Sequence, residues 1–463
     1  MKLPDSLMNS LTSVVGFDRE AFEKVHASDE QVTSIRINPS KLSEAPLPPE
    51  GGIWDFAVSW SQYGYYLNKR PSFTFDPLFH AGCYYVQEAS SMFLEQALRQ
   101  TMDISGSLKV LDLSAAPGGK STHIQSLISK ESLLVSNEVI RSRANTLKEN
   151  IIKWGSDNVI VTNNDPKDFS KVEDYFDVIV ADVPCSGSGL FRREPEAIEE
   201  WSENNVSLCS QRQQRILADA LPALKKDGIL IYSTCSYSKE EDEKIAEWLT
   251  GTLAVNDRGP TFESCRLSID KFPGIIETIS GNGTYGYRFW PDKIKGEGFF
   301  IACFRKRGGG ETETRHKARM MNPGKKELAT IGKWIRMGDH ELIRRENTIY
   351  AWSSWLSDDM SYILSKLKVI YSGVRVGELM KDKLVPDHAL AMSKLVNDSV
   401  ERVELNYDQA IQYLQRKDLK LEGVVAGWKL ACYQNHPLGW MNVLANRINN
   451  YYPKELRILK ERQ

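Results

Sequence analysis

Short apolar runs alternate with helical patterns through the middle of the chain, and this rhythm constrains the fold more than any other feature. The runs lie at 110–113, 133–135, 159–161, 178–181, 229–232 and 299–304. Several are unbroken rather than alternating, which is typical of strands buried on both faces of a parallel sheet. Helical patterns separate the first five runs, at 120–129, 139–154 and 206–226, and one more follows at 239–249. This order predicts a doubly wound α/β domain over residues 106–306.

The regions on either side of this domain are patterned differently. An amphipathic opening and strand-like runs at 35–38 and 54–66 predict a small α+β domain. Glycines and a proline punctuate a basic linker, which leads into a segment of mixed pattern. The tail combines a helical pattern at 407–416 with strand patterns at 423–433. We therefore expect five parts in the chain of 463 residues: 1–105, 106–306, 307–324, 325–405 and 406–463.

Charge is distributed unevenly along the chain. The 59 Lys and Arg residues nearly balance the 61 Asp and Glu residues, so the formal net charge is −2. Residues 305–346, however, carry twelve basic and six acidic side chains, which leaves −8 for the remainder. Two interpretations stay open for this stretch: a solvated linker, or an interdomain segment that lies against phosphates.

Composition places the chain among ordinary globular proteins. Hydrophobic residues make up 41% and charged residues 26%, which excludes a wholly disordered or collagenous chain. No apolar run approaches the roughly 20 residues that span a bilayer, and the N-terminus lacks a signal-peptide core. We expect a cytoplasmic protein with no membrane partner.

Two of the seven cysteines stand out by their context. No Cys-x-x-Cys pair occurs, so we expect neither a disulfide framework nor a metal site. Cys185 and Cys235 each follow a predicted strand, in turns rich in Ser and Gly, and Asp182 precedes the first. Ligands of open α/β sheets bind beyond the carboxyl ends of the strands, so both thiols should project toward a ligand cleft. We interpret the other five as structural: Cys83, Cys209, Cys265, Cys303 and Cys432.

The first predicted strand runs into a glycine turn and then a helix. Such a turn lets backbone amides approach a ligand closely. The Gly119-Lys120-Ser121 sequence resembles the end of a phosphate-binding loop, but that motif needs a glycine where Ser114 stands. Twenty residues after Gly118, Glu138 ends the second strand, where an acidic residue commonly accepts hydrogen bonds from a ribose. The set favours a nucleoside cofactor without a triphosphate.

Four motifs in order resemble the Nol/Nop/Sun family of RNA cytosine-5 methyltransferases. They are the segment 85–92, the turn 114–120, the Asp182-to-Gly187 motif and the Ser233-to-Ser236 motif. The resemblance implies a Rossmann-like class I methyltransferase domain, a small N-terminal α+β domain and a C-terminal PUA-like RNA-binding region. It also implies S-adenosylmethionine as cofactor. The implied cofactor-binding residues are Ser114, Ala115, Ala116, Pro117, Gly118, Gly119, Lys120, Glu138, Asp165 and Asp182.

The same resemblance assigns catalytic roles to four residues. The Cys235 thiolate would add to carbon-6 of cytosine, so that carbon-5 can attack the methyl group. Asp182 would hold or protonate N3 of the ring, and Lys120 would add positive charge nearby. Cys185 is assigned to the release step, either as the base or as the organiser of a water. The target base must be unstacked to reach such a site.

The C-terminal segments point to one type within the family. The segments 436–440 and 446–457 are similar to the PUA-like tail of the bacterial RsmF type, which modifies a cytosine of small-subunit (16S) ribosomal RNA. The implied partner is therefore ribosomal RNA, within the small subunit, bound by a monomer without a metal. Transfer RNA as substrate and a non-catalytic assembly factor remain alternatives. The outer regions would contact the RNA through Arg36, Asn38, Trp54, Trp60, Tyr63, the basic linker and the tail from Arg447 to Arg457.

Overall fold

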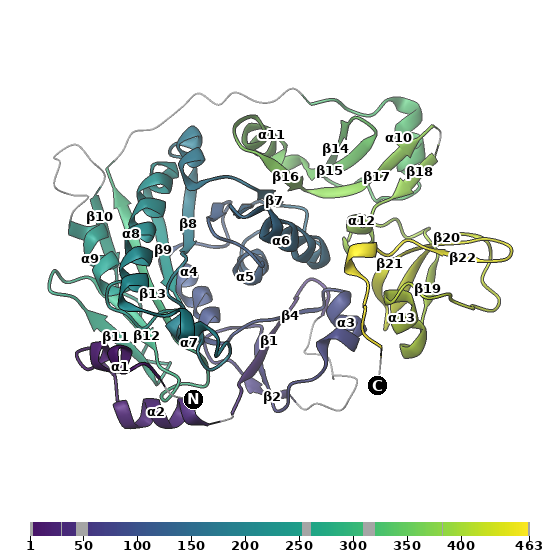
Figure 1. Ribbon diagram of the computed structural model, residues 1–463. Helices are drawn as coiled ribbons and strands as arrows, with labels where there is room; N and C mark the ends of the chain where they lie inside the picture. The colour runs from purple at the N-terminus through teal and green to yellow at the C-terminus, as the bar shows by residue number, and fades with distance from the viewer. Residues whose placement is uncertain are drawn as a thin grey trace.

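A large twisted sheet forms the centre of the computed structural model (Figure 1). The structure describes residues 3–28, 30–42, 54–251, 261–308, 320–381 and 383–461. Most of the basic linker, from 309 to 319, therefore lies outside the described residues. Of the helices in the described ranges, none has the length and apolar character needed to cross a bilayer.

Five parallel strands make the middle of this sheet, in the order β7-β6-β5-β8-β9. Their bounds are Lys109–Asp112 (β5), Leu133–Asn137 (β6), Val159–Thr162 (β7), Phe176–Asp182 (β8) and Leu224–Thr234 (β9). The chain order reverses at β5, which lies between β6 and β8. A crevice at the carboxyl ends of β5 and β8 is the place where such sheets bind ligands.

Antiparallel strands extend the sheet at both edges. The sixth predicted strand, β13 (Phe299–Arg307), pairs antiparallel with β9, so the sheet is mixed rather than purely parallel. The chain reaches β13 through a hairpin rather than a crossover helix, which reverses its direction. The hairpin strands are β11 (Ile275–Ile279) and β12 (Tyr285–Phe289), and β10 (Thr261–Cys265) also pairs with β13.

Helices cover both faces of the sheet, as unbroken apolar strands require. On one face lie α4 (Leu94–Thr101), α5 (Gly119–Leu127) and α6 (Arg141–Trp154); on the other lie α8 (Glu203–Ala220) and α9 (Glu243–Gly251) (Figure 1). Successive strand residues alternate between the two cores: Val110 packs in the first and Leu111 in the second. The predicted helix over 206–226 ends early, at Ala220. Pro222 follows within the short helix η5 (Leu221–Ala223), and β9 begins at Leu224.

The N-terminal region is a small α+β unit, as its pattern predicts. Its elements are α1 (Asp5–Leu11), α2 (Arg19–Ala27), β1 (Thr33–Ile37), β2 (Trp54–Ala57), β3 (Gly64–Leu67), η1 (Phe73–Phe75), α3 (Pro77–His80), β4 (Tyr84–Val86) and η2 (Ser90–Phe93). The aromatic run at 54–66 forms two strands of one antiparallel sheet, with the order β2-β3-β1-β4. Strand β4 leads the chain directly to the mouth of the central crevice.

Short helices follow β7 and β8. They are η3 (Pro166–Val172), η4 (Ser188–Leu190) and α7 (Ala197–Glu200).

The segment after the linker is built around its own small sheet, yet one of its strands joins the central one. Its elements are α10 (Lys325–Ile331), β14 (His340–Arg345), β15 (Thr348–Ser353), η7 (Ser354–Leu356), α11 (Ser357–Lys366), β16 (Val369–Ser372), β17 (Val374–Met380), β18 (Lys383–Pro386) and α12 (His388–Met392). Strand β16 pairs antiparallel with β7, which ties this segment to the central domain.

The C-terminal region packs against the N-terminal unit (Figure 1). Its elements are β19 (Arg402–Glu404), α13 (Tyr407–Leu414), β20 (Gly427–Tyr433), β21 (His436–Val443), β22 (Ile448–Asn450) and η8 (Lys454–Leu456). Ile35 and Leu78 from the first region share one hydrophobic core with Ile411 and Leu414 from the last. The N-terminal unit and the C-terminal region are therefore joined through one apolar core.

Candidate functional site

A cavity of about 280 Å³ opens at the carboxyl ends of β5, β8 and β9. The glycine turn after β5 lines one wall, Asp182 and Cys235 line another, and Tyr85 and Phe299 close the sides. Of the predicted site residues, the cavity is lined by Ser114, Ala115, Ala116, Pro117, Gly119, Lys120, Asp182 and Cys235. Segments that lie more than a hundred residues apart in the sequence thus line one cavity.

The glycine turn is held in a fixed shape by neighbouring side chains. Gly118 has φ +118°, a left-handed conformation that side chains other than glycine rarely adopt. The Arg143 guanidinium donates to the Ala116 carbonyl (2.9 Å), and the Asn150 amide donates to the Pro117 carbonyl (2.8 Å). Helix α5 begins directly after the turn, so its first backbone amides face the cavity side and favour an anionic group such as a carboxylate.

Asp112 supports the turn from below. Its carboxylate accepts a hydrogen bond from the Ser121 hydroxyl (2.6 Å), and its other oxygen is buried with no hydrogen-bond partner in the described part of the chain. Burial raises the pKa of Asp112 to about 7. Asp112 is fully buried and does not line the cavity, so it supports the turn through Ser121 in α5.

Lys120 and Asp182 form an ion pair inside the cavity. The Lys120 Nζ lies 2.7 Å from the Asp182 Oδ2, and the Ser233 hydroxyl donates to the Asp182 Oδ1 (2.8 Å). Burial disfavours the charged amine, but the Asp182 carboxylate outweighs that cost and raises the pKa of Lys120 above its usual value. The pair therefore presents a fixed cation and an oriented carboxylate at the same wall.

The two predicted catalytic thiols are adjacent. The sulfur atoms of Cys185 and Cys235 lie 3.1 Å apart, and Cys235 lines the cavity whereas Cys185 lies outside its lining. The hydrogen bond with Cys235, together with burial, raises the pKa of Cys185 well above its usual value. The raised pKa favours the protonated thiol form of Cys185 beside the sulfur of Cys235.

Glu241 joins the two cysteine loops, and sequence reasoning missed it. Its buried carboxylate accepts hydrogen bonds from the Ser186 amide (2.7 Å), the Ser186 hydroxyl (2.6 Å) and the Ser236 hydroxyl (2.6 Å). Each serine directly follows one of the two cysteines. Burial raises the pKa of Glu241 above its usual value. The signal in the sequence is an acidic run at 240–243, which reads equally well as the exposed start of a helix.

Two predicted cofactor contacts lie away from the cavity lining. The Glu138 carboxylate is 2% exposed and accepts from the Ile140 amide (2.9 Å). Asp165 is exposed and caps η3 by accepting from the Lys167 amide (3.2 Å). Gly118 shapes the turn without lining the cavity itself. The ribose and adenine contacts of Glu138 and Asp165 stay predictions.

Three residues predicted to contact RNA are buried instead, and those predictions are wrong. Arg36 is fully buried and donates to Gln87 (2.9 Å) and Thr122 (2.6 Å), which fastens β1 to α5. Asn38 is fully buried and donates to the Gly82 and Trp154 carbonyls. The Trp60 indole is 5% exposed and donates to the Ala89 carbonyl (2.7 Å). Polar and aromatic side chains at a domain junction look the same in sequence as those of a binding surface.

The other residues predicted to contact RNA differ in their exposure. Tyr63 is half-buried, Arg447 and Arg457 are exposed, and the side chain of Trp54 lies outside the described residues.

Four of the five cysteines interpreted as structural are buried, and Cys265 is half-buried.

Comparisons with known proteins agree with this architecture. Residues 100–305 match the family described as 16S rRNA methyltransferase RsmB/F. Residues 3–89 match the N-terminal domain of 16S rRNA methyltransferase RsmF, 328–393 the RsmF rRNA methyltransferase first C-terminal domain, and 400–458 the methyltransferase RsmF PUA domain. The fold and its site thus define a methyltransferase.

Individual relatives extend over nearly the whole chain. Ribosomal RNA small subunit methyltransferase F of Shewanella woodyi is 31% identical, over 91% of this chain and 90% of its own. The protein of the same name from Aeromonas salmonicida is 29% identical, over 98% and 97%. The structure of NSun6 from Pyrococcus horikoshii with SFG has the same fold over 66% of this chain and 99% of its own, at 18% identity and a TM-score of 0.54. The chain belongs to the 16S rRNA methyltransferase RsmB/F family.

Proposed function

We propose that this protein transfers a methyl group from S-adenosylmethionine to carbon-5 of a cytosine in 16S rRNA, through a covalent bond between Cys235 and the base. One observation carries the proposal. The Cys235 thiol lines a cavity that also holds the Lys120–Asp182 ion pair, and the protonated Cys185 thiol lies 3.1 Å behind it.

The cavity suits the proposed cofactor. The amides at the start of α5 would bind its carboxylate, and the turn from Ser114 to Lys120 would lie along it. Glu138 and Asp165 would reach its ribose and adenine after local rearrangement. When bound, S-adenosylmethionine supplies an electrophilic methyl group on a sulfonium. The residues of this chain must then make cytosine carbon-5 nucleophilic.

Cys235 and Asp182 perform that activation. The Cys235 thiolate forms a bond to carbon-6, and the electron pair of the carbon-5–carbon-6 double bond moves to carbon-5. Asp182, in its protonated form, gives its proton to N3, where charge develops, and takes it back at release; Lys120 holds the resulting carboxylate in place. Carbon-5 would then bond to the methyl carbon as the bond from that carbon to the sulfonium sulfur breaks, with the electron pair of the broken bond staying on sulfur.

Release requires two bonds to break. The proton on carbon-5 leaves to a base, and the electron pair of that bond restores the double bond as the Cys235 sulfur departs from carbon-6. The contact between the sulfur of Cys185 and that of Cys235 supports a role of Cys185 in this step. Cys185 acts as the base after its own proton has passed to solvent water, or it orders a water that accepts the carbon-5 proton.

The substrate is ribosomal RNA in its small-subunit context, bound by a cytoplasmic monomer. Stacked bases cannot enter a cavity of this depth, so the target cytosine must be flipped out. Single-stranded loops supply such bases at the lowest cost.

Transfer of labelled methyl groups from S-adenosylmethionine to unmodified small subunits tests this proposal. Naked 16S rRNA and tRNA serve as comparison substrates, and the proteins are wild type, Cys235→Ala and Cys185→Ala. We expect turnover by wild type on 16S rRNA, none by Cys235→Ala, and methylated RNA bound covalently to Cys185→Ala on denaturing gels. Methylation by Cys235→Ala would contradict the mechanism. Activity on tRNA alone would contradict the substrate.

A further inference from the structure

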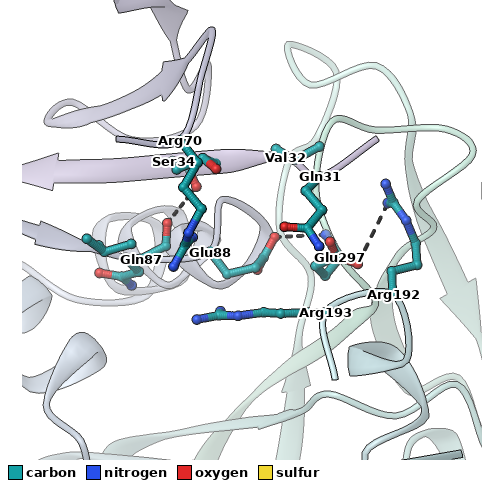
Figure 2. Close-up of a pocket in the computed structure, with 11 residues that line it drawn as sticks. Gln31, Val32, Ser34, Arg70, Gln87, Glu88, Arg192, Arg193 and Glu297 are labelled. Atoms are coloured by element: carbon teal, nitrogen blue, oxygen red, sulfur yellow. Dashed lines mark hydrogen bonds and ion pairs between the residues drawn. The ribbon is translucent and has the colours of Figure 1, made fainter. Parts of the chain in front are cut away.

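A second, smaller cavity of about 40 Å³ adjoins the catalytic one (Figure 2). The two cavities share lining residues, among them Gln87, Glu88, Arg193 and Glu297. The smaller cavity lies between the N-terminal unit, which contributes β1 and Arg70, and the loop after η4, which contributes Arg192 and Arg193. An RNA strand that places its base in the catalytic cavity can therefore run directly past this hollow.

The acidic groups of this cavity are already neutralised or engaged. The Glu88 carboxylate accepts from the backbone amides of Ser90 (2.8 Å), Ser91 (2.9 Å) and Glu297 (2.9 Å). Glu297 lies 3.7 Å from Arg192. Burial raises the pKa of Glu297 to about 7, so its charged form is disfavoured relative to that of a free glutamate. Three backbone amides meet the carboxylate of Glu88, and Arg192 meets that of Glu297.

Two arginines of the cavity remain available. Arg192 is held by Glu297 and by the carbonyls of Gly296 and Glu30. Arg70 and Arg193 are exposed, and neither forms an ion pair with any residue in the described ranges. Figure 2 shows both guanidinium groups directed into the region beneath Gln87 and Glu88. They come from different domains and reach one cavity.

The charge and size of the cavity together indicate what they bind. A cavity needs roughly 10–15 Å³ to hold one water molecule, so about 40 Å³ has room for a small polar group such as the free oxygens of a phosphate. Guanidinium groups bind phosphate oxygens in a bidentate manner.

We propose that Arg70 and Arg193 form a subsite for the phosphodiester next to the flipped cytosine. This inference rests on the proposed function. It also assigns a specific task to the junction between the two domains: the N-terminal unit supplies one half of the phosphate clamp and the methyltransferase domain the other. The clamp would hold the backbone while the base enters the cavity that Cys235 lines.

Salt-dependent binding of unmodified 16S rRNA transcript tests the subsite. The variants are Arg70→Ala, Arg193→Ala and Arg193→Lys, and Arg215→Ala serves as the matched control because it removes one exposed arginine from α8, away from both cavities. Each phosphate contact to a single strand contributes about −0.7 to the slope of log affinity against log salt. We expect Arg70→Ala and Arg193→Ala each to make the slope less negative by about 0.7 and to weaken binding about fivefold.

Two further measurements separate a phosphate contact from a purely structural role of these arginines. Arg193→Lys should keep the wild-type slope because it keeps the charge. Arg70→Ala should raise the KM for RNA and leave the KM for S-adenosylmethionine unchanged, since Arg70 does not line the larger cavity.

Slopes of Arg70→Ala and Arg193→Ala equal to that of Arg215→Ala would overturn the subsite, as would weaker binding without a change of slope. Wild-type methylation of the same transcript is measured in parallel. Absence of methylation both on this transcript and on unmodified small subunits would contradict the proposed function, whereas the slopes decide the subsite independently.

Discussion

At the scale of single residues, the Lys120–Asp182 pair distinguishes this cavity from an ordinary ligand pocket. Lys120 lies in the first turn of α5 and Asp182 at the end of β8, and their charged groups meet at 2.7 Å. The Asp182 side chain is 33% exposed, and the lysine and the Ser233 hydroxyl hold it in one orientation. In its protonated form it can donate to the ring nitrogen of a cytosine while Cys235 attacks carbon-6.

Asp182→Asn tests this role. The amide keeps the size of the side chain but cannot carry the negative charge or protonate N3, so we expect kcat to fall by about 100-fold to 1,000-fold with the KM for RNA little changed. Steady-state methylation of 16S rRNA measures both. Asp177→Asn is the control, since Asp177 pairs with Lys225 (2.5 Å) at the opposite end of the same strand. Equal rates for the two variants would contradict the assignment.

The sequence locates the reactive residues but not their contacts. Cys185, Cys235 and the glycine turn could be predicted because each follows an apolar strand whose end faces the ligand crevice. The sulfur–sulfur contact and the Lys120–Asp182 pair depend on the order of strands in the sheet, which local patterns do not contain. Arg36 and Asn38 were misassigned because the burial of a polar residue depends on which domain packs over it.

At the scale of elements, Glu241 holds the loops after β8 and β9 in register. Its carboxylate engages one serine beside each cysteine. The separation of the two thiols therefore depends on a residue that does not line the cavity. Glu241 is a positioning residue.

Glu241→Gln tests that dependence. The amide nitrogen of glutamine cannot accept the hydrogen bonds that Glu241 Oε2 accepts from the Ser186 and Ser236 hydroxyls. We therefore expect the loops after β8 and β9 to separate. We expect kcat to fall about 10-fold to 100-fold while the KM for S-adenosylmethionine stays unchanged, because the glycine turn is untouched. Glu240→Gln, which alters the neighbouring carboxylate paired with Lys244, should behave as wild type. A lower melting temperature with unchanged kcat would show a structural role only.

The positions of the central strands could be predicted from the sequence, whereas the direction of one strand and the end of one helix could not. The strands β5 to β9 all lie where unbroken apolar runs predict them. The direction of β13 was not predictable, because an apolar run does not say whether a crossover helix or a hairpin precedes it. The helix that was predicted to extend to residue 226 ends at Ala220. The prediction was too long because the apolar residues of η5 and β9 continue the helical pattern.

At the scale of the whole molecule, the segments after the linker pack against the central sheet and the N-terminal unit. Strand β16 extends the central sheet beside β7, and α13 packs its apolar residues on the N-terminal unit. Neither association could be predicted, since both join segments about 200 or more residues apart. The pattern at 407–416 predicts the helix but not its partner.

Removal of 406–463 should therefore destabilise the protein rather than merely weaken RNA binding. The truncation uncovers Ile35, Leu78 and their neighbours, and each large apolar side chain exposed costs about 1.5–3 kcal/mol. We expect a clearly lower melting temperature and a tendency to aggregate. The exposed Arg447, changed to Ala, provides a comparison that leaves the core intact and reports on RNA contact alone. A truncated chain that melts with the full-length protein would contradict the shared core.

The central claim is that Cys235 bonds to the cytosine that receives the methyl group. The most direct measurement uses 16S rRNA transcribed with 5-fluorocytidine, wild-type protein and S-adenosylmethionine. Fluorine on carbon-5 cannot leave as a proton does, so the adduct persists after methyl transfer. Mass spectrometry of the digested complex should find the methylated nucleotide attached to the peptide that contains Cys235. Attachment to Cys185, or no attachment while ordinary 16S rRNA is methylated, would contradict the account.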